Sequence, residues 1–263
     1  MKLKSISSIK QTVLVIISVI FPYLTNGQTA SFPNHDSNSI RIINQAIFKC
    51  EVQFPDNYVQ NKGYPLLIAL HGGGGSYETF MEVWDHFEDP QFILATPQAP
   101  YKWLLGDQIG YDWAAWPSKD TSYMKEAIVL TSKYIETIIK TLKSRYKAEN
   151  IYLLGFSQGS IIAQIAGIEN HDHLEGLIIC SGPAMHHPDK PEIIWPPLEL
   201  IKRANHLNIF IAHGKDDAIV DFELARKSKD QYIQNGFEVT LYEFEGGHEI
   251  SMSAMQEIQK WLN

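Results

Sequence analysis

Short apolar runs alternate along most of this chain with longer segments in which apolar residues recur every three or four positions. The runs are nearly continuous, as expected for strands covered on both faces, and the longer segments have the period of amphipathic helices. This alternation is typical of βα units around a mainly parallel sheet, so it predicts an α/β fold with helices on both faces. The predicted core strands are Pro65–Leu70, Phe92–Thr96, Ile151–Gly155, Gly176–Cys180, Leu207–Ala212 and Glu238–Phe244, and the predicted helices are Tyr77–Phe87, Tyr123–Tyr146, Gln158–Ile168, Asp221–Gln234 and Ser251–Leu262.

Three segments lie outside this alternation. Ile40–Phe54 carries two β-rich stretches broken by Asn44-Gln45, which predicts an opening hairpin. Gln98–Thr121 and Ser181–Pro197 are rich in aromatic residues or proline and match neither a helix nor a strand. Because long irregular segments in compact domains are usually functional, we expect these two to form loops or lids beside a site.

The N-terminus has the pattern of a secretory leader. Basic residues precede the apolar run Val13–Phe21, which is too short to span a bilayer comfortably. Small residues, Thr25 and Gly27, occupy the −3 and −1 positions of a cut before Gln28. The prediction is a signal peptide at 1–27 and an exported protein, periplasmic or secreted. An uncleaved membrane anchor is the alternative. In either case, we expect the protein to contact a membrane only through this N-terminal segment.

Composition narrows the class of protein. The 263 residues, 44% of them hydrophobic, suffice for one large core, so 28–263 is predicted to be a single catalytic domain. A formal net charge of −8 without a basic block argues against a nucleic-acid partner. Cys50 and Cys180 are the only cysteines, and both lie in apolar stretches, which predicts buried free thiols rather than a disulfide. No pattern specifies an oligomeric state.

A candidate nucleophile follows the strand predicted at Ile151–Gly155. The segment Gly155-Phe156-Ser157-Gln158-Gly159 joins that strand to an amphipathic helix. A strand, a G-x-S-x-G turn and a helix raise a serine on a sharp elbow, where glycines flank it because side chains would collide. The helix N-terminus also stabilises developing negative charge. Ser157 is therefore the predicted nucleophile.

A serine hydroxyl near neutral pH needs a base, and the base needs a carboxylate that orients it. His248 follows the last predicted strand, and Asp216 and Asp217 follow the strand before it. Both strands end at the same edge of the sheet as Ser157, where open α/β sheets bind ligands. We predict His248 as the base and favour Asp217 as its orienting acid, with Asp216 as the alternative.

A glycine-rich loop, His71-Gly72-Gly73-Gly74-Gly75, follows the strand predicted at Pro65–Leu70. Glycines let the backbone approach a substrate closely, and backbone N–H groups aimed at a tetrahedral oxyanion stabilise it. We predict that the N–H groups of Gly73 and Gln158 form an oxyanion hole. A phosphate cradle is the rival interpretation, but the G-x-x-x-x-G-K-[ST] pattern is missing.

Together these motifs resemble the α/β-hydrolase superfamily and, within it, the phospholipase/carboxylesterase group that includes acyl-protein thioesterases, with kinship to bacterial predicted esterases. The resemblance begins at about Tyr64 and runs to the C-terminus. The order of nucleophile, acid and base is that of the superfamily, and the family's H-G-x-x-D spacing in His213–Asp217 places its aspartate on Asp217. The family's H-G-x-G-D loop is a four-glycine run here, closer to the loops of feruloyl esterases and polyester depolymerases.

The resemblance and the motifs together predict an exported serine carboxylesterase for small-molecule acyl, feruloyl or phospholipid esters that uses an acyl-enzyme. No cofactor is expected, and no metal site, because the histidine pairs in the sequence lack a convergent third ligand. The alternatives are an exported serine peptidase and an inactive hydrolase fold that serves as a binding module. Four tryptophans are predicted to line an acyl or aryl pocket: Trp103, Trp113, Trp116 and Trp195. Plain loop packing is the alternative, because aromatic residues bury large areas whatever their role.

Overall fold

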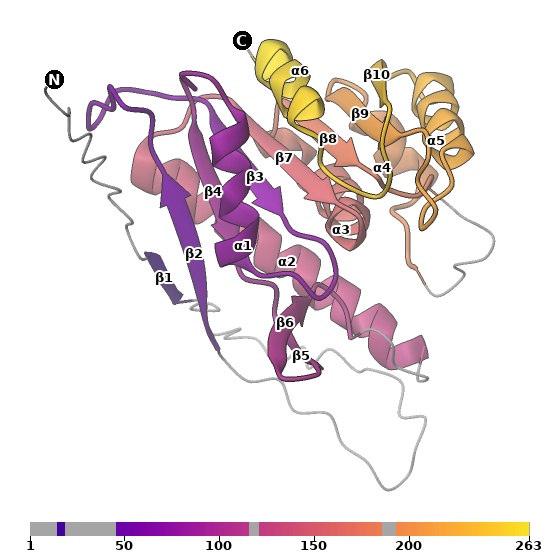
Figure 1. The fold of residues 1–263 in the computed structure, drawn as a ribbon, viewed down its shortest axis with the longest axis horizontal. Helices are drawn as coiled ribbons and strands as arrows, with labels where there is room; N and C mark the ends of the chain where they lie inside the picture. Colours follow the sequence, from indigo (N-terminus) through magenta and orange to yellow (C-terminus); the bar gives the residue numbers. More distant parts are fainter. Residues whose placement is uncertain (1–14, 19–45, 116–120, 186–192, 263) are drawn as a thin grey trace, which may run out of the picture.

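The computed structural model describes residues 15–18, 46–115, 121–185 and 193–262. Its main sheet has the strand order β1-β2-β4-β3-β7-β8-β9-β10, with β1, β2 and β4 paired antiparallel and all later neighbours parallel (Figure 1). The predicted mainly parallel α/β architecture is confirmed. The strands are β1 (Val15–Ser18), β2 (Ile47–Gln53), β3 (Leu66–Leu70), β4 (Ile93–Pro97), β7 (Ile151–Phe156), β8 (Gly176–Cys180), β9 (Asn208–Gly214) and β10 (Glu238–Phe244).

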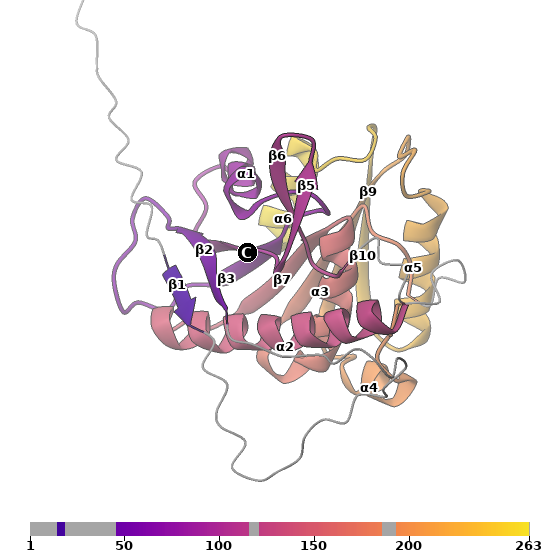
Figure 2. The same ribbon diagram turned by 90° about the horizontal axis from the view of Figure 1, so that it is seen from below.

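Helices cover both faces of this sheet (Figure 2). Each of the five predicted helices has a counterpart, although Tyr77–Phe87 divides into a short α-helix and a 3₁₀-helix. The short helix α4 follows Pro197 and was not predicted, because its six residues are too few to show a helical period. The helices are α1 (Tyr77–Phe80), η1 (Met81–His86), α2 (Thr121–Tyr146), α3 (Gln158–Glu169), η2 (His171–His173), α4 (Leu198–Arg203), α5 (Glu223–Gln234) and α6 (Met252–Leu262).

Two apolar layers hold the helices to the sheet. Side chains alternate between the faces of a strand, and in β3 Leu66 and Ile68 belong to one core cluster while Leu67 and Ala69 belong to the other. The first layer packs under α2, α3, α4 and α5, and the second packs under α1, η1 and α6. Because both faces are buried, the central strands β3, β4 and β8 are buried along their whole length, which is why the sequence pattern located them.

The segment Gln98–Thr121, expected to be irregular, instead contains a hairpin. Its strands β5 (Tyr101–Leu105) and β6 (Gln108–Asp112) pair with each other in a separate two-stranded sheet. Figure 1 shows the hairpin as a projection from the main sheet. The prediction was wrong because Leu104 and Ile109 are largely exposed, so the burial that produces an apolar strand pattern is missing.

The N-terminal predictions lie mainly outside the described residues. Of the predicted leader, the structure describes only Val15–Ser18, which pairs antiparallel with Ile47–Cys50. Of the predicted hairpin in Ile40–Phe54, it describes β2, whose partners are β1 and β4. Cleavage before Gln28 therefore stays a prediction. Within the described residues, no helix is both long enough and apolar enough to cross a membrane.

Candidate active site

Ser157 lies on the sharp turn between β7 and α3. Its backbone has φ 52° and ψ −118°, a region that residues other than glycine rarely adopt. A Cβ on Gly155 would lie 2.2 Å from the Gly159 carbonyl oxygen, and one on Gly159 would lie 2.4 Å from that of Leu70. Both glycines are required by close backbone approach, so the turn holds the Ser157 side chain clear of the sheet.

The loops after β9 and β10 bring the predicted acid and base to this serine. His248 Nε2 lies 2.9 Å from Ser157 Oγ, and His248 Nδ1 lies 2.8 Å from Asp217 Oδ2. The Phe156 ring packs against the imidazole at a centroid distance of 5.0 Å. Since Asp217 can only accept when ionised, the Nδ1 atom of His248 carries the proton and Nε2 is left to accept one from the serine.

Asp217 is held in a fixed orientation. Its Oδ1 accepts hydrogen bonds from the Ile219 and Val220 N–H groups at 2.9 and 2.8 Å, and its side chain is fully buried. Burial by itself raises the pKa of Asp217, but the hydrogen bonds from Val220, His248 and Ile219 together outweigh burial and leave that pKa below its ordinary value. The neighbouring Asp216 is exposed, so the structure selects Asp217 as the carboxylate that reaches His248.

The glycine loop passes directly beside the elbow. A Cβ on Gly72 would lie 3.5 Å from Ser157 Cβ, and Gly74 adopts φ 73°, which favours glycine. Among the residues that the structure describes, the N–H groups of Gly73 and Gln158 have no hydrogen-bond acceptor. Two N–H groups without an acceptor, next to a serine hydroxyl, are the arrangement that an oxyanion requires.

Asp112, a residue to which the sequence patterns gave no role, fastens this loop. Its Oδ1 accepts a hydrogen bond from the Gly74 N–H at 2.9 Å, and its carboxylate also bonds the Gln158 side chain. Gln158 Oε1 in turn accepts from the Trp113 N–H at 2.8 Å. Asp112 is 2% exposed, and burial raises its pKa more than these hydrogen bonds lower it. The network joins the hairpin, the glycine loop and the elbow.

Replacing Asp112 with alanine should therefore lower kcat for ester hydrolysis about 10- to 100-fold with a small change in KM, because the loop loses its anchor. Asp112→Asn keeps an oxygen that can accept from Gly74 and should recover most of the rate. Steady-state kinetics on both variants, with thermal unfolding beside them, test this. An alanine variant that unfolds at a lower temperature but keeps the wild-type kcat would show that Asp112 has only a structural role.

His71 forms a hydrogen bond within the glycine loop, and its side chain stays neutral. Its Nδ1–H donates to the Gly72 carbonyl oxygen at 2.7 Å, and burial lowers its pKa to about 4. The Trp113 Nε1–H donates to the His71 carbonyl oxygen at 2.7 Å. His71 therefore serves as a hydrogen-bonding group of the loop and not as a base near neutral pH.

The pKa of His71 predicts a pH-dependent loss of stability. Between its ordinary pKa of 6.5 and about 4, the unfolded chain binds a proton at His71 and the folded chain does not. Stability therefore falls as pH drops through this range, by about 2 kcal/mol from this residue between pH 7 and pH 5. Urea unfolding at the two pH values measures it. His71→Asn, whose amide N–H can replace Nδ1–H, should show a smaller loss, and an equal loss would contradict the assignment.

The four predicted pocket tryptophans have different positions. Trp113 is 0% exposed and bonds the loop from beneath, so its predicted role in contacting substrate is wrong and its role is structural. Trp195 is 8% exposed and packs in the larger core cluster. Trp103 is 39% exposed on the hairpin, and Trp116 lies outside the described residues. Aromatic size alone did not distinguish lining from packing.

Other reactive groups take no part in this arrangement. Cys50 and Cys180 are buried and free, as predicted, and burial raises the pKa of the Cys180 thiol to about 12. The described residues contain no group of three or more histidine, cysteine or acidic side chains that could hold a metal ion. Among these groups in the described residues, Ser157 is thus the candidate nucleophile, because its hydroxyl lies within hydrogen-bond distance of a base, His248.

A mainly parallel sheet with a serine on the elbow after a central strand, hydrogen-bonded to a histidine at a strand end, defines the class of α/β-hydrolases. Within this class, the chain belongs to the phospholipase/carboxylesterase family, whose model matches residues 57–263. Acyl-protein thioesterase 1 of Neurospora crassa is 26% identical over 213 residues, covering 74% of this chain and 84% of the relative. Acyl-protein thioesterase 1 homolog 2 of Dictyostelium discoideum is 29% identical over 189 residues, covering 65% and 78%.

Solved structures share the fold. Acyl-protein thioesterase 2 of Zea mays superposes with a TM-score of 0.62 at 22% identity, covering 81% of this chain and 96% of that one. The Bacillus cereus carboxylesterase gives 0.61 at 17% identity, covering 82% and 93%. The predicted α/β-hydrolase fold and family resemblance are confirmed. The protein is a serine hydrolase of esters or thioesters.

Proposed function

We propose that this chain hydrolyses carboxylic esters through an acyl-enzyme on Ser157, with His248 as general base and Asp217 orienting His248. The observation that carries the proposal is the continuous chain of hydrogen bonds from Ser157 Oγ through the imidazole to Asp217. The two N–H groups without an acceptor beside Ser157 add to it. Membership of a family of esterases and thioesterases supports the same chemistry.

In the first half-reaction, Ser157 Oγ attacks the ester carbonyl carbon while His248 Nε2 takes the hydroxyl proton. The carbonyl oxygen becomes negative and accepts hydrogen bonds from the Gly73 and Gln158 N–H groups, each of which is worth roughly 3 kcal/mol of barrier. The imidazolium is stabilised by ionised Asp217, whose lowered pKa keeps it charged at neutral pH. His248 then gives its proton to the departing alcohol, which leaves an acyl group on Ser157.

The second half-reaction releases the acid. A water molecule takes the place of the alcohol, His248 Nε2 removes its proton, and the hydroxide attacks the acyl carbon. The proton returns to Ser157 Oγ as the acyl group leaves. Every proton transfer uses His248, so the chemistry requires no metal or organic cofactor.

Thioesters are the second candidate substrates, because the relatives in Neurospora crassa and Dictyostelium discoideum are named acyl-protein thioesterases. We favour oxygen esters because the glycine loop differs from the family's H-G-x-G-D pattern. Matched pairs of oxygen and thiol esters with the same acyl chain compare the two. A kcat/KM that is much higher for the thioester, after correction for the spontaneous rates, would reverse this preference.

Export also belongs to the proposal. The leader pattern in the first 27 residues supports a periplasmic or secreted enzyme. N-terminal sequencing of the protein recovered outside the cytoplasmic membrane is expected to begin at Gln28. A chain that begins at Met1 and remains with the membranes would support the uncleaved anchor.

The nucleophile is tested directly with a fluorophosphonate probe and peptide mass spectrometry. The adduct is expected on the Ser157 peptide of the purified wild-type protein and is expected to be lost in His248→Ala, because the hydroxyl then has no base. Circular dichroism of His248→Ala controls for folding. Folded wild-type protein without an adduct on Ser157 would favour the binding-module alternative, and cleavage of aminoacyl arylamides in preference to esters would favour the peptidase.

A further inference from the structure

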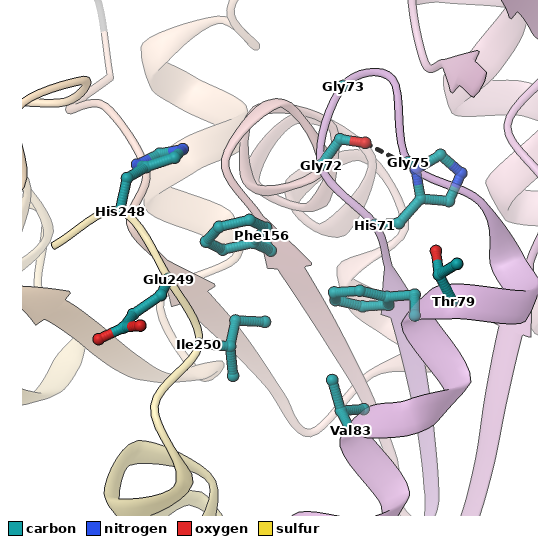
Figure 3. A pocket seen from close by; sticks show the side chains of 11 residues that line it. His71, Gly72, Gly73, Gly75, Thr79, Val83, Phe156, His248, Glu249 and Ile250 are labelled. Atoms are coloured by element: carbon teal, nitrogen blue, oxygen red, sulfur yellow. Dashed lines mark hydrogen bonds between the residues drawn. The ribbon is translucent and has the colours of Figure 1, made fainter. Parts of the chain in front are cut away.

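A cavity of about 320 Å³ opens beside His248, between α1 and η1 on one side and the segment after His248 on the other (Figure 3). Its lining includes the start of the glycine loop, so it adjoins the space where an ester carbonyl would be held. Thr79, Val83 and Ile250 form its side walls, and Phe156 lies between them. The proposed mechanism assigns this cavity no role.

We propose that the cavity binds the leaving group of the substrate, and that this group is an uncharged, apolar alcohol or thiol of small size, such as a short branched, alicyclic or aryl group. The inference rests on the proposed function and specifies the substrate of the same site. At about 320 Å³, the volume is near the lower end of the roughly 300–1,000 Å³ of ligand pockets. One ring or a short branched chain fits within such a space.

The position of His248 assigns the cavity to the leaving group rather than to the acyl group. In the tetrahedral intermediate, the departing oxygen must lie against His248 Nε2 to receive its proton, and the acyl chain points away from that nitrogen. His248 itself lines the cavity, and the two residues after it continue the wall. The cavity is thus on the side of the serine from which the alcohol departs.

We direct the acyl chain away from the cavity, toward the hairpin formed by β5 and β6. The cavity is built on α1, η1 and the segment leading to α6, the elements that pack on one face of the sheet. The hairpin that carries Trp103 leads through Trp113 into the core cluster on the other face. An acyl chain directed toward the hairpin and a leaving group in this cavity would therefore diverge from the carbonyl carbon, as the tetrahedral geometry requires.

The residues that line the cavity favour an uncharged leaving group. Val83, Phe156 and Ile250 present hydrocarbon, and Figure 3 shows Val83 and Ile250 directed into the space beside Phe156. Glu249 is the one acidic residue in the lining, and Figure 3 shows its carboxylate turned away from the cavity. Because no lysine or arginine lines the cavity, an anionic leaving group would lose its hydration without gaining a partner.

Two ester series separate the leaving group from the acyl group. The first joins acetate to ethanol, butanol and cyclohexylmethanol, alcohols of similar acidity, and the second joins ethanol to acids of increasing length. In the wild type, kcat/KM is expected to rise at least about 10-fold from ethyl to cyclohexylmethyl acetate, since each methylene in an apolar pocket is worth about 10-fold or more. An acetate ester of a hydroxycarboxylic acid should gain nothing from its size.

Two variants fill the cavity. Val83→Phe enlarges a buried residue in the wall of the cavity. Thr79→Trp enlarges an exposed lining residue, so it tests the same cavity without disturbing the core if Val83→Phe folds poorly. Both should abolish the rise in the leaving-group series while the ratios in the acyl series stay as in the wild type. Thr240→Trp, at an exposed position on β10 that does not line the cavity, is the matched control and should keep both series.

The outcomes are distinguishable. Variants that change the acyl ratios and spare the leaving-group ratios would overturn the assignment and make the cavity an acyl site. A flat leaving-group series in the wild type would overturn it as well, even with ester hydrolysis intact. If the wild type cleaved no oxygen ester and no thioester, the proposed function itself would fail, and the leaving-group site would fail with it.

Discussion

Ser157→Ala is expected to lower kcat for ester hydrolysis by about 10⁵- to 10⁶-fold, because the acyl-enzyme cannot form without the hydroxyl. Binding of substrate should change little, since the cavity, the glycine loop and the N–H groups remain. The residual rate should still exceed the spontaneous one, because N–H groups beside the carbonyl stabilise attack by water. Initial rates on a chromogenic ester at mildly alkaline pH measure the effect.

Ser144→Ala is the matched control. Ser144 is exposed on α2, so the same atom is removed from the protein without touching the site, and kcat should be unchanged. Circular dichroism and thermal unfolding should be the same for both variants within the experimental error. A Ser157→Ala protein that hydrolyses esters at a rate comparable to the wild type would require another nucleophile, and the proposed mechanism would have to be abandoned.

Asp217→Asn is expected to lower kcat about 10⁴-fold while the fold is retained. The amide oxygen can still accept from Ile219 and Val220, but an NH₂ group then faces His248 Nδ1 unless the amide gives up those bonds. The imidazole is driven toward the tautomer with its proton on Nε2, which cannot accept the proton of Ser157. The pH-rate profile should also change, because a stronger base can take the place of His248 only in alkaline solution.

Asp216→Asn makes the same chemical change one residue earlier and is the sharpest control. Asp216 is exposed, and its N–H donates to the Gly246 carbonyl oxygen, a backbone contact that the substitution leaves in place. Its kcat should stay within about twofold of the wild type, as for most surface substitutions. A large loss in Asp216→Asn with a small one in Asp217→Asn would show that the other carboxylate orients the base in solution.

The sequence predicted the core of the fold because buried strands have an unambiguous local signature. Five consecutive buried residues in β3, and five in β8, produce continuous apolar runs that polar turns bound on both sides. Ser157 follows such a run and His248 follows the β-rich strand β10, and the carboxyl ends of parallel strands lie on one edge. For that reason their proximity could be predicted, although the two residues are 91 positions apart.

Other features could not be predicted, because they depend on what an exposed or aromatic residue meets in space. The hairpin β5–β6 was missed since the apolar side chains near its turn, Leu104 and Ile109, are exposed and the strands give no continuous apolar run. Trp113 was expected to line a pocket because it is a large aromatic residue after the strand predicted at Phe92–Thr96, but it is fully buried and hydrogen-bonds the His71 carbonyl oxygen. Asp112 had no motif, and its role depends on a Gly74 N–H 38 positions away.

Local pattern thus determined the core strands and the longer helices, their order, and which polar residues stand at the catalytic edge of this sheet. Only the folded chain decided between Asp216 and Asp217, fastened the glycine loop through Asp112, and opened a cavity beside His248. The physical reason is the distance along the chain over which each feature is determined. Burial along a strand or helix is recorded in the residues of that element, whereas the direction of a side chain and the space left between two distant segments depend on how all the elements pack.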